Sequence, residues 1–96
     1  MTIAQEENGT RGSFFVEENG NRVAELAYTW HDKGLISIDH TEVDESLEGK
    51  GVGSALVEKV VSFAREKGIK IRLYCPFATI VFKRHKEYLD VLEETS

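Results

Sequence analysis

The sequence predicts an α+β fold whose elements follow in the order β-β-β-α-β-α. Three observations lead to this prediction. Apolar residues alternate with period two in several runs before residue 44. A stripe with helical period then covers 51–67, and one more alternating run is followed by a helical C-terminal segment. An antiparallel meander joined by a crossover helix to a later strand implies a mixed sheet with helices packed on it.

The first two strands are predicted at 13–18 and 22–31, because an Asn-Gly turn at 19–21 separates two alternating runs. A third strand is predicted at 35–43, after a turn at 32–34. The residues of the second strand expected in the core are Ala24, Leu26, Tyr28 and Trp30. By simple alternation, one face of the third strand carries Ile36, Ile38, His40 and Glu42, and the other carries Leu35, Ser37, Asp39, Thr41 and Val43.

An amphipathic helix is predicted from Gly51 to Lys67, and Gly68 is its natural C-terminal stop. Its apolar stripe consists of Val52, Leu56, Val60, Phe63 and Ala64. The next strand spans 69–75, with Ile69, Ile71, Leu73 and Cys75 on its core face. Pro76 follows in the first-turn position that a helix tolerates best. The segment 77–92 is expected to form one or two short helices, with Phe77, Ile80, Val81 and Tyr88 facing inward.

The composition fits one small domain over residues 1–96, and we expect a monomer in the cytoplasm. The polar segments 1–12 and 93–96 are the candidates for flexible ends. A formal net charge of −5 argues against non-specific binding to nucleic acid. No apolar run is long enough to cross a membrane. The single cysteine excludes an internal disulfide, and three scattered histidines give no reason to expect a metal site.

Three glycines at 49, 51 and 53 directly precede the predicted helix. Such a turn lets backbone N–H groups approach an anion, and the helix N-terminus adds a partial positive charge. The Walker loop does not fit, because Lys50 is followed by Gly51. The dinucleotide fingerprint does not fit either, because Ser54 stands where it needs glycine or alanine. We therefore expect a loop that binds pyrophosphate in another way; the alternative is a connection without a ligand.

The stretch "LEGKGVGSALVEKVVSFAREKG" resembles the acetyl-CoA pyrophosphate loop and following helix of the GCN5-related N-acetyltransferases. That loop is usually written Arg/Gln-x-x-Gly-x-Gly/Ala. Gly51 and Gly53 match its glycines, whereas Glu48 stands in place of the polar or basic anchor. The small, single-domain branch of the superfamily resembles most of the chain, through "IDHTEV" at 38–43, the glycine loop, "CPFA" at 75–78 and "RHKEY" at 84–88. Family members often have proline where Lys86 stands.

The resemblance implies a minimal version of the family fold, with acetyl-CoA or CoA as co-substrate and no metal. The pantetheine arm would lie in a cleft between 38–43 and 69–75, with the acyl thioester between His40 or Thr41 and Cys75. The acceptor, a small molecule or a protein amine, is not identified by the sequence, and its side of the site is expected to be open. The residues implied to contact CoA are Thr41, Glu42, Val43, Glu48, Gly49, Lys50, Gly51, Val52, Gly53, Ser54, Cys75, Phe77 and Arg84.

Two residues are the candidates for catalysis. Cys75 precedes a helix whose dipole favours a thiolate nucleophile, although a lone cysteine is often simply packed. His40 is the candidate general base, because histidine exchanges protons near neutral pH, and the alternatives are a structural histidine or Glu42 as base. The expected function is N-acetyl transfer from acetyl-CoA, with an acetylated cysteine as one route. The alternatives are a non-catalytic CoA-binding module and an interaction protein that has inherited the fold.

Overall fold

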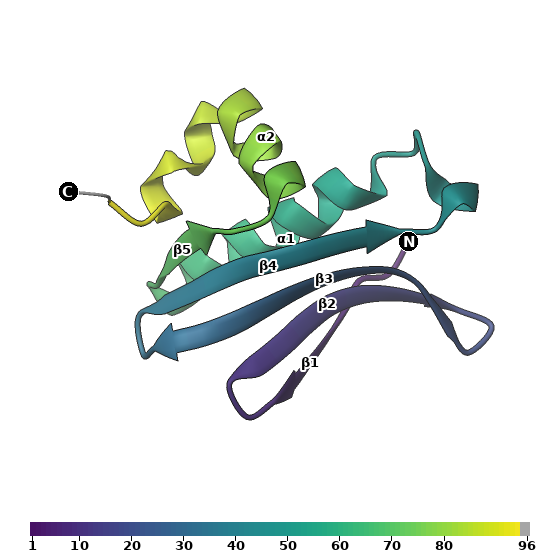
Figure 1. Cartoon of the computed structure of the whole chain (residues 1–96), viewed down its shortest axis with the longest axis horizontal. Helices are drawn as coiled ribbons and strands as arrows, with labels where there is room; N and C mark the ends of the chain where they lie inside the picture. Colours follow the sequence, from purple (N-terminus) through teal and green to yellow (C-terminus); the bar gives the residue numbers. More distant parts are fainter. Residues whose placement is uncertain (95–96) are drawn as a thin grey trace.

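A computed structural model describes residues 1–94 and contains one five-stranded sheet in the order β1-β2-β3-β4-β5 (Figure 1). Neighbouring strands are antiparallel from β1 to β4, and β5 is parallel to β4. The elements are β1 (Ala4–Asn8), β2 (Arg11–Glu18), β3 (Asn21–Asp32), β4 (Leu35–Val43), the 3-10 helix η1 (Glu45–Leu47), α1 (Val52–Lys67), β5 (Lys70–Leu73), α2 (Pro76–Arg84) and the 3-10 helix η2 (Lys86–Val91). The predicted α+β class with its mixed sheet is confirmed.

The N-terminal segment contains a strand that the sequence did not predict. Residues 4–8 form β1 at the edge of the sheet, within the segment 1–12 that we expected to be flexible. Three side chains anchor β1. Gln5 donates to the Tyr28 hydroxyl at 2.7 Å, that hydroxyl donates to Glu7 at 2.6 Å, and Glu6 accepts from Arg22 at 2.8 Å. All five β1 residues are exposed, so the strand has no apolar alternation. Residues 95–96, part of the other end expected to be flexible, lie outside the described residues.

A bulge in β4 changes which side chains face the core. The register with β3 passes from Tyr28↔Ile38 to Ala27↔His40, so Asp39 is an extra residue without a partner. Beyond it Thr41 pairs with Leu26, which is buried on the α1 side of the sheet. His40 therefore lies on the opposite face. Our assignment of His40 and Glu42 to the face of Ile36 and Ile38 was wrong, because one extra residue inverts the alternation.

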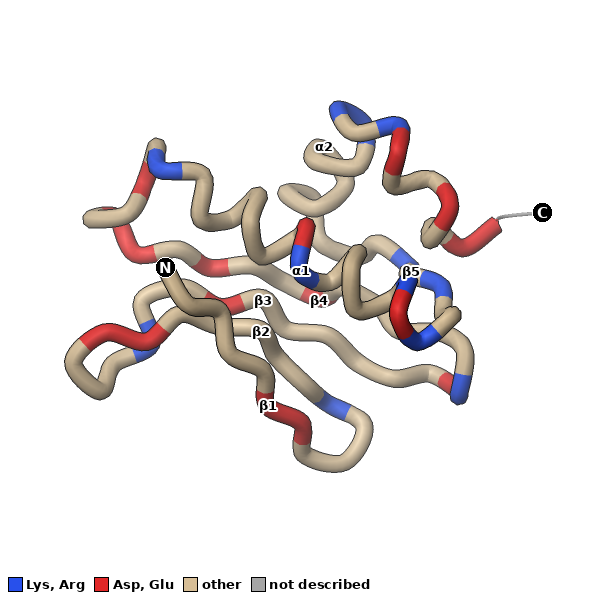
Figure 2. Tube along the Cα trace, turned by 180° about the vertical axis from the view of Figure 1, so that it is seen from behind, with Lys and Arg blue, Asp and Glu red and all other residues tan. Residues whose placement is uncertain are grey.

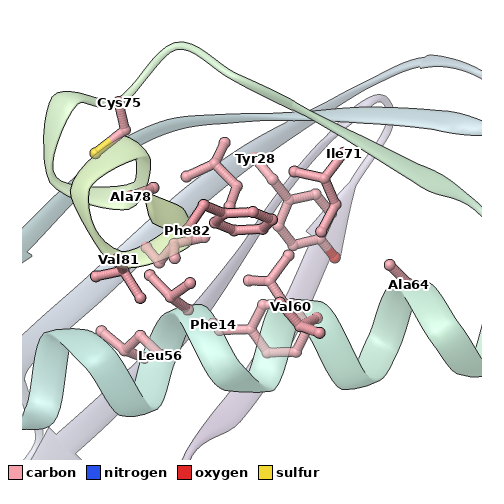
Figure 3. Close-up of a cluster of buried hydrophobic side chains, with 14 of the residues drawn as sticks. Phe14, Tyr28, Leu56, Val60, Ala64, Ile71, Cys75, Ala78, Val81 and Phe82 are labelled. Atoms are coloured by element: carbon pink, nitrogen blue, oxygen red, sulfur yellow. The ribbon is translucent and has the colours of Figure 1, made fainter. Parts of the chain in front are cut away.

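The two helices pack against each other and against the sheet around one core (Figure 3). Helix α1 ends as predicted, at a left-handed Gly68. In α2 the buried residues are Ala78, Val81 and Phe82. The predicted inward positions of Phe77 and Ile80 were wrong, since these side chains are 39% and 49% exposed. Pro76 is the first helical residue, and the helix that starts there turns positions 78, 81 and 82 toward the core.

None of the helices in residues 1–94 is long and apolar enough to cross a membrane. Acidic and basic residues are interspersed along much of the chain trace (Figure 2). The turn between β4 and α1 is an exception, because it carries Asp44, Glu45 and Glu48 and a single basic residue, Lys50.

Candidate functional site

Strands β4 and β5 pair over a short distance and then separate. Their register ends at Ile38↔Leu73. The carbonyl of Ile38 accepts two further hydrogen bonds, from the N–H of Tyr74 at 3.0 Å and of Cys75 at 3.1 Å. Beyond Ile38, no backbone group among residues 1–94 bonds to the β5 side of β4. We call this point, defined by Ile38, Tyr74 and Cys75, the fork.

The open edge of β4 beyond the fork presents backbone groups of Thr41 and Val43. Asp44 donates its N–H to the carbonyl of Val23 at 2.8 Å, which places its backbone on the β3 side. Because the backbone groups of successive strand residues point to opposite sides, those of Thr41 and Val43 point away from β3. This edge can pair with an extended ligand that carries amide groups.

Cys75 closes the fork from the β5 side. Its side chain is 3% exposed, and its thiol donates to the hydroxyl of Thr41, with Sγ and Oγ1 3.6 Å apart. Cys75 is also the N-cap of α2, and its carbonyl accepts from both the N–H and the hydroxyl of Thr79 at 3.0 Å. Figure 3 shows Cys75 at the first turn of α2, at one end of the buried cluster. The structure thus brings Thr41 and Cys75 together.

His40 is not brought to Cys75. It is exposed, and it pairs with Ala27 on the face of the sheet opposite α1. Glu42 lies on the same face, across from Glu25. The expected contact between His40 and the thiol is therefore absent from the described residues. His40 and Glu42, the two candidate bases, are exposed on the face of the sheet opposite α1.

The glycine loop supplies a group of unpaired backbone donors. Gly49 and Gly51 adopt left-handed conformations, with φ of +80° and +75°. Gly51 is the N-cap of α1 and makes no side-chain cap bond. Within residues 1–94, the N–H groups of 51–54 have no acceptor. They border a pocket of about 210 Å³ lined by Val43, Leu47, Glu48, Gly49, Gly51, Val52, Gly53, Ser54 and Phe77.

Gly53 has a different structural role from Gly49 and Gly51. A Cβ on Gly53 would lie 2.8 Å from Cζ of Phe77, whereas a Cβ on Gly49 or Gly51 would have no neighbour within 4 Å. Gly53 therefore lets the ring of α2 pack onto the start of α1. The sequence reasoning assigned all three glycines to a ligand and missed this contact. Phe77 is exposed because its other side forms a wall of the pocket.

The side chains around the pocket contribute little positive charge. Nearby Asp44 is acidic, and hydrogen bonds from the backbone and side chain of Ser46 lower the pKa of its carboxyl group, which favours its negatively charged form. Lys50 is in the loop, but it does not line the pocket. Arg84 ends α2, and the rise of an α-helix places it about 10 Å along the axis from Phe77. An anion bound here would be held mainly by the backbone N–H groups and the dipole of α1.

A larger pocket lies elsewhere. It measures about 620 Å³ and lies between β1 and α1, where its lining includes Glu7, Trp30, Lys59 and Phe63. No residue of the fork or of the glycine loop lines it. We place the candidate site at the fork, because the unpaired backbone groups, the thiol and the helix N-terminus meet there.

Comparisons with known proteins identify relatives of the chain in sequence and in fold. The family model described as GCN5-related N-acetyl-transferase matches residues 13–91. Protein NATD1 of Gallus gallus is 29% identical over 94 residues, which cover 95% of this chain and 86% of that protein. A GCN5-like protein of Staphylococcus aureus, solved by NMR, superposes with a TM-score of 0.70 at 33% identity over 97% of this chain and 90% of that one.

A likeness in fold extends to a more distant enzyme. The aminoglycoside N-acetyltransferase AAC(6')-Iy, solved in complex with CoA, superposes with a TM-score of 0.60. It is 16% identical, and the match covers 99% of this chain and 93% of that one.

Proposed function

Because the chain belongs to the GCN5-related N-acetyltransferase family, we propose that it binds acetyl-CoA at the fork and transfers the acetyl group to an amine. The single observation that carries this proposal is the end of β4–β5 pairing at Ile38, beside an open strand edge and unpaired helix N–H groups. The CoA complex of the distant aminoglycoside N-acetyltransferase supports the choice of ligand.

The binding role of each part follows from its chemistry. The N–H groups of residues 51–54 would donate to the pyrophosphate, and hydrogen bonds to a charged group contribute about 1.5–3 kcal/mol each. The amides of the pantetheine arm would pair with Thr41 and Val43 on the open edge. The ring of Phe77 would shield the loop from water. Lys50 and Arg84 would add charge at the periphery.

One route passes through the thiol of Cys75. Its sulfur attacks the carbonyl carbon of acetyl-CoA, the bond between that carbon and the CoA sulfur breaks, and the thiol proton passes to the leaving CoA thiolate. The product is an acetyl thioester on Cys75. A neutral amine then attacks the carbonyl carbon of this thioester, and the bond to the cysteine sulfur breaks as the amide forms. The proton lost by the amine passes through a base to the cysteine thiolate and restores the thiol.

The thiol and the candidate bases lie on opposite faces of β4. Cys75 lies on the α1 side of β4, where CoA would bind, whereas His40 and Glu42 are exposed on the opposite face, from which an acceptor would approach. We therefore propose His40 as the base for the amine rather than for the thiol, with Glu42 as the alternative. In a direct route the amine would attack acetyl-CoA itself, and Cys75 would be a wall of the cleft.

A second candidate function is binding of CoA without catalysis. The observation that favours it is the environment of the Cys75 sulfur. Among residues 1–94, the hydroxyl of Thr41 is the only side-chain group hydrogen-bonded to this thiol, and a hydroxyl is a poor base.

The deciding experiment combines calorimetry with intact mass. The protein is titrated with CoA, then incubated with acetyl-CoA and a panel of primary amines while released CoA is measured. We expect binding, CoA release that depends on the amine, and acetylated product. Binding without release would contradict transfer and support the binding module. Absence of CoA binding would contradict both functions.

A further inference from the structure

A cluster of polar side chains surrounds the β4 bulge on the face opposite α1. Ser37, which is fully buried, donates its hydroxyl to Oδ1 of Asp39 at 2.7 Å. The hydroxyl of Thr29, on the neighbouring strand, donates to Oδ2 at 2.5 Å. Both oxygens of the Asp39 carboxylate are thus occupied. Hydroxyl donors to a carboxylate form short and comparatively strong hydrogen bonds.

These bonds span the bulge. Asp39 is the extra residue, Ser37 stands two positions before it, and Thr29 is the β3 partner of Ser37. If β4 continued without the bulge, His40 would pair with Leu26 and would face α1. With the bulge, Thr41 takes that place and reaches Cys75. Whether Asp39 is bulged out or paired therefore decides whether Thr41 or His40 faces the thiol of Cys75.

The same cluster reaches the other arm of the fork. Nε2 of His31 lies 2.8 Å from the Ser37 hydroxyl, and its ring meets the ring of Tyr74 edge-on, with centroids 6.1 Å apart. Arg72 donates to the Tyr74 hydroxyl at 3.3 Å. Tyr74 immediately precedes Cys75, and its N–H bonds to Ile38 at the fork. The cluster is therefore in contact with β4 just before the bulge and with Tyr74, which follows β5 and precedes the thiol.

We propose that Asp39 is a positioning residue for the acetyl-transfer site: its bonds to Thr29 and Ser37 hold the bulge that directs Thr41 toward Cys75 and His40 toward the opposite face. The catalytic meaning of this arrangement rests on the proposed function. The register itself is a property of the fold, so it can be measured without any turnover.

The test compares variants that remove the bonds in different ways. Asp39→Ala removes both acceptors, and Asp39→Asn keeps the shape and one carbonyl oxygen. The double variant Thr29→Val/Ser37→Ala removes both donors and keeps the carboxylate. Gly20→Ala, in the turn between β2 and β3 where φ is +83°, controls for a general loss of stability. The readouts are NOEs between Leu26 and its β4 partner, the rate of alkylation of Cys75 by iodoacetamide, and the Kd for CoA.

We expect Asp39→Ala and the double variant to lose the NOEs between Leu26 and Thr41 and to expose Cys75 to faster alkylation. Their Kd for CoA should rise about tenfold, which corresponds to about 1.4 kcal/mol. Asp39→Asn should retain an intermediate Kd, and Gly20→Ala should match the wild type in all three readouts.

A folded Asp39→Ala variant with wild-type NOEs and wild-type affinity for CoA would overturn the proposal. If that variant does not fold, Asp39→Asn and the double variant provide the same comparison. Failure of the proposed function would look different: the wild-type protein would bind CoA without transferring acetyl, while the NOE and alkylation readouts would still decide the role of Asp39.

Discussion

The ring of Phe77 lies against the backbone of Gly53, at a distance that leaves no room for a methyl group. A Cβ at this position would meet the ring at 2.8 and 2.9 Å. This contact joins the first turn of α1 to the first turn of α2, on the rim of the glycine-loop pocket.

We expect Gly53→Ala to destabilise the protein and to displace Phe77. Overpacking costs about 1–3 kcal/mol, and this outweighs the gain of up to about 1 kcal/mol from alanine in a helix. Urea unfolding would measure the change. In the double variant Gly53→Ala/Phe77→Leu, the smaller leucine side chain should restore most of the lost stability. A single Gly53→Ala variant as stable as the wild type would show that the ring moves freely.

Gly51→Val should weaken CoA binding at least tenfold, or about 1.4 kcal/mol, because a branched side chain would stand beside the donors of the loop. The positive φ at Gly51 adds backbone strain of about 1–2 kcal/mol. Gly20→Val, at a similar φ in a distant turn, is the matched control for that strain. It should lower stability and leave CoA affinity unchanged in calorimetry. Equal CoA affinity in the two folded variants would show that the loop is not part of the CoA-binding site.

Lys50→Ala should reduce CoA affinity less than Gly51→Val does. The side chain of Lys50 is exposed and does not line the loop pocket, so a phosphate would interact with it through solvent. The CoA titration should also show a stronger salt dependence in the wild type than in Lys50→Ala. A loss as large as that of Gly51→Val would mean that charge, rather than the backbone, holds the anion.

Cys75→Ala should abolish any acetyl adduct and leave CoA binding largely intact, because the thiol is a small part of the cleft. The adduct would be mapped by mass spectrometry after digestion at mildly acidic pH, which preserves thioesters. Cys75→Ser is the conservative control, since it keeps a hydrogen-bonding group beside Thr41. Acetyl groups found only on lysines, with equal yield in Cys75→Ala, would leave Cys75 as a packed wall.

The ion pair between Arg72 and Glu93 predicts a loss of stability in acid. Arg72 donates two hydrogen bonds to Glu93, both at 2.8 Å, and these bonds lower the pKa of the carboxyl group. A lowered folded-state pKa stabilises the protein above the unfolded-state value, about 4.3 for glutamate. That contribution disappears as the pH falls below this value.

Glu93→Gln should therefore be less stable than the wild type at pH 7, and the two should converge in acid. Thermal unfolding from pH 7 to pH 3 would measure the difference. Glu94→Gln, in which the neighbouring acidic residue is neutralised instead, is the control. A difference between wild type and Glu93→Gln that does not change with pH would contradict the role of the ion pair.

The sequence predicted the elements that have strong local signals. The Asn-Gly turn, the stripe of α1 with its Gly68 stop, and Pro76 at the start of α2 all act within a few residues, and all were found. The strand β1 escaped prediction because its five residues are exposed and, apart from Ala4, polar, and because it is held by distant Tyr28.

The candidate site was harder to predict, because it depends on register between strands. A bulge has no signature in the run 35–43, so alternation assigned the wrong faces to His40 and Thr41. The contact of Gly53 with Phe77 joins residues far apart in the chain and was equally hidden. Motif spacing identified the loop and Cys75, whereas the roles of Ser37 and Thr29 depend on bonds that only the three-dimensional structure contains.

The early end of β4–β5 pairing also bears on the protein's behaviour at high concentration. A strand edge with free N–H and C=O groups is a template for intermolecular β-pairing and aggregation. The charged side chain of Glu42, between Thr41 and Val43, opposes such pairing at this edge. A bound pantetheine arm would cover the same groups. Occupancy by CoA would then protect the protein from self-association as well as stabilise its fold, so storage with CoA should keep it monodisperse.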